Sequence, residues 1–131
     1  MGRTILLYDD DCGFCRVCVA LVLTWDRRRR LRPVALQSEE AGRLLAGMSE
    51  AERMASWHLA QPEGGLNSAG AAFAPLCREL PGGGPLAALA ERFPGAAERG
   101  YALVAHHRSL FGSALPDGVR RWADATIDRR R

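Results

Sequence analysis

The most constraining feature of this chain is a Cys-x-x-Cys motif that follows directly on a short apolar stretch. Residues 5–8 are apolar, Asp9–Asp11 interrupt the run, and Cys12 and Cys15 precede a second, longer apolar segment. This order predicts a strand, a turn and a helix whose first turn carries both sulfurs. Because a helix N-terminus stabilises a thiolate, the arrangement favours thiol redox chemistry.

The composition of the 131-residue chain fits one globular domain with a hydrophobic core. Hydrophobic residues make up 47% of the sequence, and the formal net charge is only +3. The arginines gather in Arg27–Arg30 and Arg129–Arg131, with no aromatic residues between them. This pattern is typical of a solvated loop and tail, so we expect no nucleic-acid partner, although an anionic partner stays open. Asp26 is also expected in water.

The first residues, the apolar runs and the cysteine content predict the cellular compartment of the protein. The first residues do not show the succession of basic, apolar and small residues of a signal peptide. The longest apolar run, Val17–Leu23, is far shorter than the ~20 residues that a membrane span needs. We therefore expect a cytoplasmic protein without a membrane partner. In a reducing compartment, four cysteines favour catalysis or metal binding over structural disulfides.

Local patterns predict alternating strands and helices. Pro33 lacks an amide donor, so the strand that contains it is expected at a sheet edge. A helix pattern joins the first two strands, which should be parallel, whereas a tight turn joins the last two, which should be antiparallel. The expected strands are Thr4–Tyr8, Leu31–Leu36, Ser56–Gln61 and Leu66–Asn67, and the expected helices are Cys15–Trp25, Glu39–Ala46, a short turn from Ser49, Ala71–Leu80, Leu86–Phe93, Ala96–His107 and a last one that Asp117 caps.

This order of elements predicts an α/β fold of the thioredoxin-like type. We expect a four-stranded mixed sheet with flanking helices and extra helices toward the C-terminus. Residues 1–115 would form the redox domain, and residues 116–131 would form a helical, arginine-rich tail. The dithiol follows the first strand, which is where such a fold carries its reactive cysteines.

The two cysteines of the motif are expected to divide the chemistry. Cys12, near the helix N-cap, would attack a partner disulfide, and Cys15, one turn further on, would resolve the mixed disulfide. Asp9, at the strand end, is a candidate proton acceptor for the resolving thiol. Asp10 and Asp11 are interpreted as solvated turn residues or an N-cap. Charged carboxylates here would raise the thiol pKa, which Arg16 can partly offset.

Cys18 leaves an alternative open, because it extends the motif to Cys-x-x-Cys-x-x-Cys. Zinc or an iron–sulfur cluster could use Cys12, Cys15 and Cys18, but no fourth ligand has diagnostic spacing. Cys18 is more simply a small core residue, as is Cys77. We therefore expect no cofactor and no metal. A non-catalytic thioredoxin-like binding module is a third hypothesis.

Three further side chains are interpreted by their local pattern. His58 alternates with Trp57 and Leu59 in a predicted strand, so it is expected to point outward. Trp57 and Phe73 are interpreted as core residues.

The motifs together resemble the DCC family of thiol-disulfide oxidoreductases. That family opens with an apolar strand followed by Asp-x-x-Cys-x-x-Cys. The resemblance covers about the first 115 residues and is carried by Leu6–Cys15, Ala35–Glu40, Ser68–Ala72 and Tyr101–Gly112, the last of which ends in Arg108-Ser109-Leu110-Phe111-Gly112. The final helix lies outside it.

The resemblance implies a thioredoxin-like fold, with Asp9, Cys12 and Cys15 as the signature residues. It also implies a protein or small-molecule thiol or disulfide as the partner. Two departures from the pattern stand out. Asp10 takes a position where many relatives carry glycine, and Arg53–Ser56 lacks the proline that thioredoxins place before the third core strand.

Overall fold

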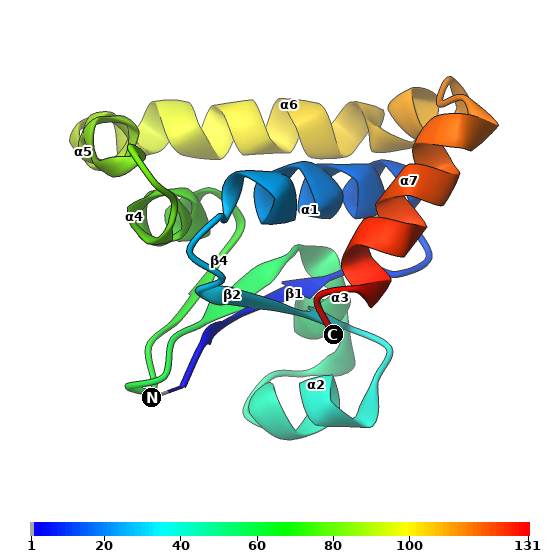
Figure 1. The fold of residues 1–131 in the computed structure, drawn as a ribbon. Coiled ribbons are helices and arrows are strands. Elements are labelled where there is room, and N and C mark those ends of the chain that lie inside the picture. The colour runs from blue at the N-terminus through cyan, green and yellow to red at the C-terminus, as the bar shows by residue number, and fades with distance from the viewer. Residues whose placement is uncertain (1) are drawn as a thin grey trace.

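The computed structural model describes residues 2–131 and contains one four-stranded sheet with helices on both faces (Figure 1). The strands are β1 (Thr4–Tyr8), β2 (Leu31–Ala35), β3 (His58–Ala60) and β4 (Leu66–Ser68). The helices are α1 (Gly13–Trp25), α2 (Glu39–Leu44), α3 (Glu50–Ala55), α4 (Phe73–Glu79), α5 (Gly84–Arg92), α6 (Pro94–Ser113) and α7 (Asp117–Asp128), and a 3₁₀ turn, η1, spans Ala69–Ala72.

The order of the strands is β2-β1-β3-β4. β1 and β2 are parallel, β1 and β3 are antiparallel, and β3 and β4 form an antiparallel hairpin. The predicted α/β class, the mixed sheet and the thioredoxin-like fold are confirmed. The edge position expected for the strand with Pro33 is confirmed as well, because β2 is the outermost strand of this order and pairs with β1.

β1 is covered on both faces, which explains why its sequence is apolar throughout rather than alternating. Leu6 and Tyr8 point into a core shared with α1, α4 and Ile127 of α7. Leu7 points to the opposite face and packs against β2, α2 and the residues around them. The end of this strand, and the dithiol after it, therefore stand on a rigid support.

α1 lies over the sheet and is itself covered by α6 and α7 (Figure 1). Gly13, rather than Cys15, is its first residue, so the predicted start of this helix was two residues late. α6 is longer than predicted at both ends, since it runs from Pro94 to Ser113. The expected cap of the last helix was wrong by one residue, because α7 begins at Asp117 and its N-cap residue is Pro116.

Asp26 and Arg130 are buried, so the expectation that these two charged residues are solvated was wrong. Asp26 is 1% exposed and pairs with Arg130, which is 8% exposed. The amides of Arg30 and Leu31 donate to the Asp26 carboxylate, and the Arg130 guanidinium also donates to the carbonyl of Leu23. A charge is buried here because its partner and two backbone donors replace water. This pair ties the C-terminus to the end of α1.

The interpretation of His58 as outward-facing was also wrong. It does lie on the face opposite Leu59, but the chain around α3 covers that face, and His58 is only 1% exposed. Its Nε2 lies 2.9 Å from the carbonyl of Arg53 and its Nδ1 lies 2.5 Å from the Ser68 hydroxyl. A carbonyl can only accept, so Nε2 donates to it, and the Ser68 hydroxyl can pair with Nδ1 as donor or acceptor, so both ring nitrogens have a partner.

Candidate active site

The turn between β1 and α1 brings the strand end and the dithiol together. The amide of Cys12 donates to the carbonyl of Asp9 at 3.3 Å, which closes the turn, and Cys12 becomes the N-cap residue of α1. The carbonyl of Cys12 then accepts from the amide of Arg16 at 3.0 Å. The expected N-cap position of Cys12 is confirmed.

The Cys12 sulfur occupies the place that a serine or aspartate oxygen takes in most N-caps. It accepts a hydrogen bond from the backbone amide of Cys15 at 3.3 Å. The sulfur therefore lies against the first amides of the helix, at the positive end of its dipole. Both cysteines are half-buried, and all four cysteines of the chain are free thiols.

Cys15 has a different environment, which raises its pKa to about 12. Burial is the largest cause, followed by the hydrogen bond and the charge of Cys12, and the Asp9 carboxylate adds to the rise. The Arg108 guanidinium acts in the opposite direction. These effects together favour the protonated form of Cys15.

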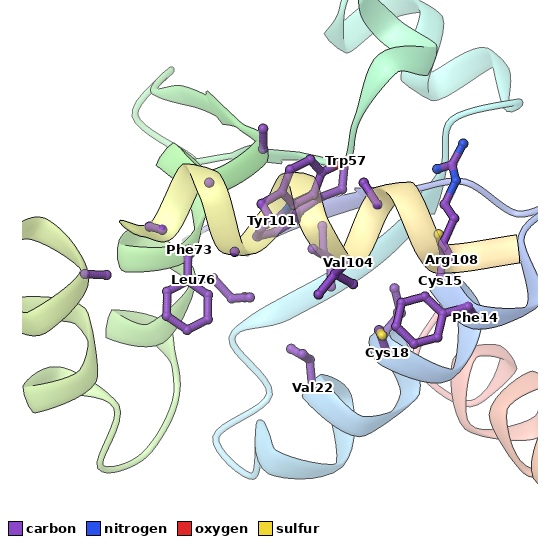
Figure 2. Close-up of a pocket in the computed structure, with 18 of the residues that line it drawn as sticks. Phe14, Cys15, Cys18, Val22, Trp57, Phe73, Leu76, Tyr101, Val104 and Arg108 are labelled. Carbon is purple, nitrogen blue, oxygen red and sulfur yellow. The ribbon is translucent and has the colours of Figure 1, made fainter. Parts of the chain in front are cut away.

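Arg108 is the functional candidate that the sequence interpretation missed. It belongs to α6, ninety-three positions after Cys15, and it lines the same cavity as Cys15 (Figure 2). Burial lowers its pKa, but the charges of Cys15, Cys12 and Asp9 outweigh this and raise it overall. The signal was present in the Arg108–Gly112 motif, yet nothing in the sequence placed that motif beside the dithiol.

Asp9 lies where the sequence indicated, at the end of β1 and close to Cys15. One of its oxygens, Oδ1, accepts from the amide of Asp11 at 3.0 Å and from Nε2 of Gln37 at 2.8 Å. The side chain is half-buried and lines the same cavity as Cys15. These bonds fix the carboxylate in place beside the thiol whose pKa it raises.

Asp10 is neither a free turn residue nor the N-cap, which corrects that interpretation. Its carboxylate forms ion pairs with Arg16 and Arg131 and accepts a hydrogen bond of 3.2 Å from the Tyr8 hydroxyl. Arg16 also pairs with Asp124 of α7 at 2.7 Å. The expected offset of negative charge by Arg16 is confirmed, and the residues around α7 take part in it. Asp11 is exposed.

Cys18 and Cys77 are not gathered with the dithiol into a metal site. Within residues 2–131, no group of three or more His, Cys, Asp or Glu side chains is arranged to hold a metal ion. Cys77 is 1% exposed, as expected for a core residue. Cys18 is half-buried and faces a cavity, and burial, with a smaller contribution from the Cys12 charge, raises its pKa.

A cavity of about 780 Å³ opens beside Cys15 between α1, α6 and the η1–α4 segment (Figure 2). Cys15, Cys18 and Arg108 lie at one end of it, and Phe73 and Leu76 lie toward the other. Phe73 was expected in the core but is 36% exposed, because the predicted helix is interrupted by η1 and its ring lines this cavity. Trp57 does pack on the core and also lines the cavity.

One comparison with known proteins identifies a family for this chain. The family model described as DCC1-like thiol-disulfide oxidoreductase matches residues 6–113, which run from β1 to the end of α6. Comparisons with curated proteins and with solved structures give no match. Within residues 2–131, no helix is both long enough and apolar enough to span a bilayer. The match includes the Cys-x-x-Cys motif and Arg108, and the chain belongs to the DCC1-like thiol-disulfide oxidoreductase family.

Proposed function

We propose that this protein is a thiol-disulfide oxidoreductase that cycles Cys12 and Cys15 between dithiol and disulfide. The observation that carries the proposal is the hydrogen bond from the Cys15 amide to the Cys12 sulfur at the N-terminus of α1. It gives the two sulfurs different chemistry. Cys12 receives the amide and the dipole, whereas burial and the neighbouring charges keep Cys15 protonated.

The first step forms a mixed disulfide. The Cys12 thiolate attacks a partner disulfide R–S–S–R′, the Cys12–S–R bond forms, and R′S⁻ leaves and takes up a proton. Arg108 is proposed to stabilise the negative charge that is shared among the sulfurs at this stage. It is a positioning and charge-stabilising residue of α6, and its role is supported by its electrostatic interaction with both cysteines.

The second step resolves the mixed disulfide. Cys15 loses its proton and attacks the Cys12 sulfur, the Cys12–Cys15 bond forms, and RS⁻ leaves. Two electrons have then passed from the dithiol to the partner, and a thiol reductant restores the dithiol. Because the Cys12 charge contributes to the raised pKa of Cys15, its loss in the mixed disulfide makes Cys15 easier to deprotonate when it must act.

Asp9 is proposed to accept the Cys15 proton. Its fixed carboxylate beside the cavity supports this role, and its hydrogen bonds with Gln37 and the Asp11 amide keep it oriented. The same carboxylate raises the pKa of Cys15, so it both restrains the thiol and offers it a base.

The setting of the reaction is part of the proposal. Four free thiols suit a compartment that keeps cysteines reduced, so we propose a cytoplasmic location and a protein or small-molecule disulfide as partner. Every residue with a proposed redox role lies in residues 1–115. Residues 116–131 would act as a supporting tail, since Asp124 and Arg131 contact the Arg16 and Asp10 pair beside the dithiol.

Trapping of the mixed disulfide tests the proposal. In Cys15→Ser, the reaction with a model disulfide should stop at a covalent adduct on Cys12, which mass spectrometry detects. Cys12→Ser should form no adduct and should lose reductase activity. Cys77→Ala, whose sulfur is buried in α4, is the matched control and should react like the unmodified protein. Full reductase activity in Cys12→Ser would contradict the proposal.

A further inference from the structure

The cavity beside Cys15 is large and has a defined shape. Its volume of about 780 Å³ falls within the range of about 300–1,000 Å³ that is usual for small-molecule sites. It extends from the sulfur of the resolving cysteine, past Tyr101 and Val104, to Phe73 of α4 (Figure 2). The proposed redox function uses only one end of it.

The way in which α6 is held explains why the cavity is not closed by packing. Near the start of α6, the backbone of Glu98 lies so close to Gly70 that a Cβ on Gly70 would be 2.8 Å from it. Toward the other end, the rings of Phe14 and Phe111 are in contact, with 5.2 Å between their centroids. Between these two contacts, α6 presents Gly100 and Ala105 to the cavity beside Tyr101 and Val104, and the two small residues leave space unfilled.

The polarity of the residues that line the cavity changes from one end to the other. Aromatic, aliphatic and small residues form most of the lining, whereas its charged groups, Asp9 and Arg108, accompany Cys15. Among the ion pairs that residues 2–131 form, none includes Arg108. A guanidinium that forms none of these ion pairs, placed beside a thiol at the end of an apolar cavity, is complementary to a molecule with an apolar body and a negative charge that develops at sulfur.

We propose that this cavity binds the apolar body of a low-molecular-weight disulfide and presents its sulfur–sulfur bond to the dithiol. This inference rests on the proposed function and names its substrate class. Cys12 takes one sulfur of the disulfide and the other leaves as a thiolate beside Arg108. Attack by Cys15 then releases the first sulfur, so that one disulfide becomes two thiols while the dithiol becomes the Cys12–Cys15 disulfide.

A small molecule suits the cavity better than a protein segment. A single apolar side chain next to a protein disulfide would fill only a fraction of the volume, whereas a ligand with two hydrocarbon groups can occupy it from Cys15 toward Phe73. Burial of such groups would supply affinity in proportion to the apolar area removed from water.

Two disulfides with thiols of similar acidity test the proposal: dibenzyl disulfide, which is apolar, and bis(2-hydroxyethyl) disulfide, which is polar. The reduced protein is mixed with each one, and the second-order rate constant of its oxidation is measured in a single turnover. The test variant is Gly100→Leu, which places a side chain into the cavity where a Cβ has open space. Gly95→Leu is the matched control, because Gly95 is also in α6, has open space, and does not line the cavity.

The expected result is a preference for dibenzyl disulfide of about tenfold or more in the wild-type protein, since burying one aromatic ring is worth more than 1.4 kcal/mol. Gly100→Leu should remove most of this preference, and Gly95→Leu should keep it. Equal rate constants for the two disulfides in the wild-type protein would overturn the proposal. An equal preference for dibenzyl disulfide in Gly100→Leu and Gly95→Leu would overturn it as well.

Binding of dibenzyl sulfide separates this proposal from the proposed function. This thioether has the same apolar groups but cannot exchange with a thiol, and its binding is measured by calorimetry. Binding to the wild-type protein and Gly95→Leu, but not to Gly100→Leu, supports the cavity as the site even if no disulfide oxidises the dithiol. Absence of binding to the wild-type protein overturns it, whatever the dithiol does.

Discussion

The backbone amide of Cys15 donates a hydrogen bond of 3.3 Å to the sulfur of Cys12. Two cysteines three positions apart therefore have different environments, since Cys12 lies at the N-terminus of α1 and Cys15 is one turn further along the helix. The pKa of Cys15 is raised to about 12, and that of Cys18 is raised as well, chiefly through burial. The difference between these sulfurs leads to direct predictions about their reactivity.

The first prediction concerns alkylation. Iodoacetamide reacts with thiolates, so at pH 8 it should label Cys12 well before Cys15 and Cys18, whose raised pKa values keep them protonated. Labelling of Cys15 should increase only as the pH rises toward 12. Peptide mapping by mass spectrometry gives the order, and labelling of Cys15 before Cys12 would contradict the assignment of roles.

The second prediction concerns Asp9. Asp9→Asn keeps an oxygen that can accept from Gln37 and the Asp11 amide but removes the base, so the resolving step should slow by about 10²-fold. Rapid-quench experiments that follow the decay of the mixed disulfide measure the rate of this resolving step. The opposite result, faster resolution, would mean that the carboxylate acts only through its charge, which raises the pKa of Cys15.

The third prediction concerns Arg108. Arg108 lowers the pKa of Cys15, so Arg108→Gln should raise that pKa further and lengthen the lifetime of the mixed disulfide. We expect a change of about tenfold, which corresponds to ~1.4 kcal/mol. Arg108→Lys should restore part of the rate because it retains the charge. Arg99→Gln, an exposed position of the same helix, is the control. Equal lifetimes in Arg108→Gln and Arg99→Gln would contradict the role of Arg108.

Stability provides the fourth prediction. Arg130→Met leaves the Asp26 carboxylate buried without its partner and should lower the free energy of unfolding by about 3–5 kcal/mol. Asp26→Asn combined with Arg130→Met should recover part of that loss, since no charge is then buried. Urea denaturation followed by circular dichroism measures these values. A loss below about 1 kcal/mol in Arg130→Met would show that the pair behaves like an exposed one.

The sequence predicted the elements that follow from local patterns. Three patterns predicted the arrangement of the sheet: the continuous apolar run of β1, the proline of β2 and the tight turn before β4. Each of them reflects burial or backbone geometry within a few residues. The N-cap position of Cys12 followed from the same kind of argument. These features do not depend on how distant helices pack.

What the sequence did not reveal depends on distant segments. Asp26 and Arg130 each resemble solvated charges until α7 packs on α1 and buries them together. His58 alternates like an exposed residue until the chain around α3 covers it. Arg108 approaches Cys15 only because α6 lies along α1, and the same packing creates the cavity that Phe73 lines. Each of these outcomes requires knowledge of helix positions that a local pattern does not contain.

A redox titration with disulfide mapping tests the central claim most directly. The protein is equilibrated in buffers of defined thiol-to-disulfide ratio, quenched by alkylation and mapped by mass spectrometry. We predict one reversible two-electron couple in which the oxidised form carries a Cys12–Cys15 disulfide, retained in Cys18→Ala and Cys77→Ala. The absence of a reversible couple, or an oxidised form that joins Cys15 to Cys18, would contradict it.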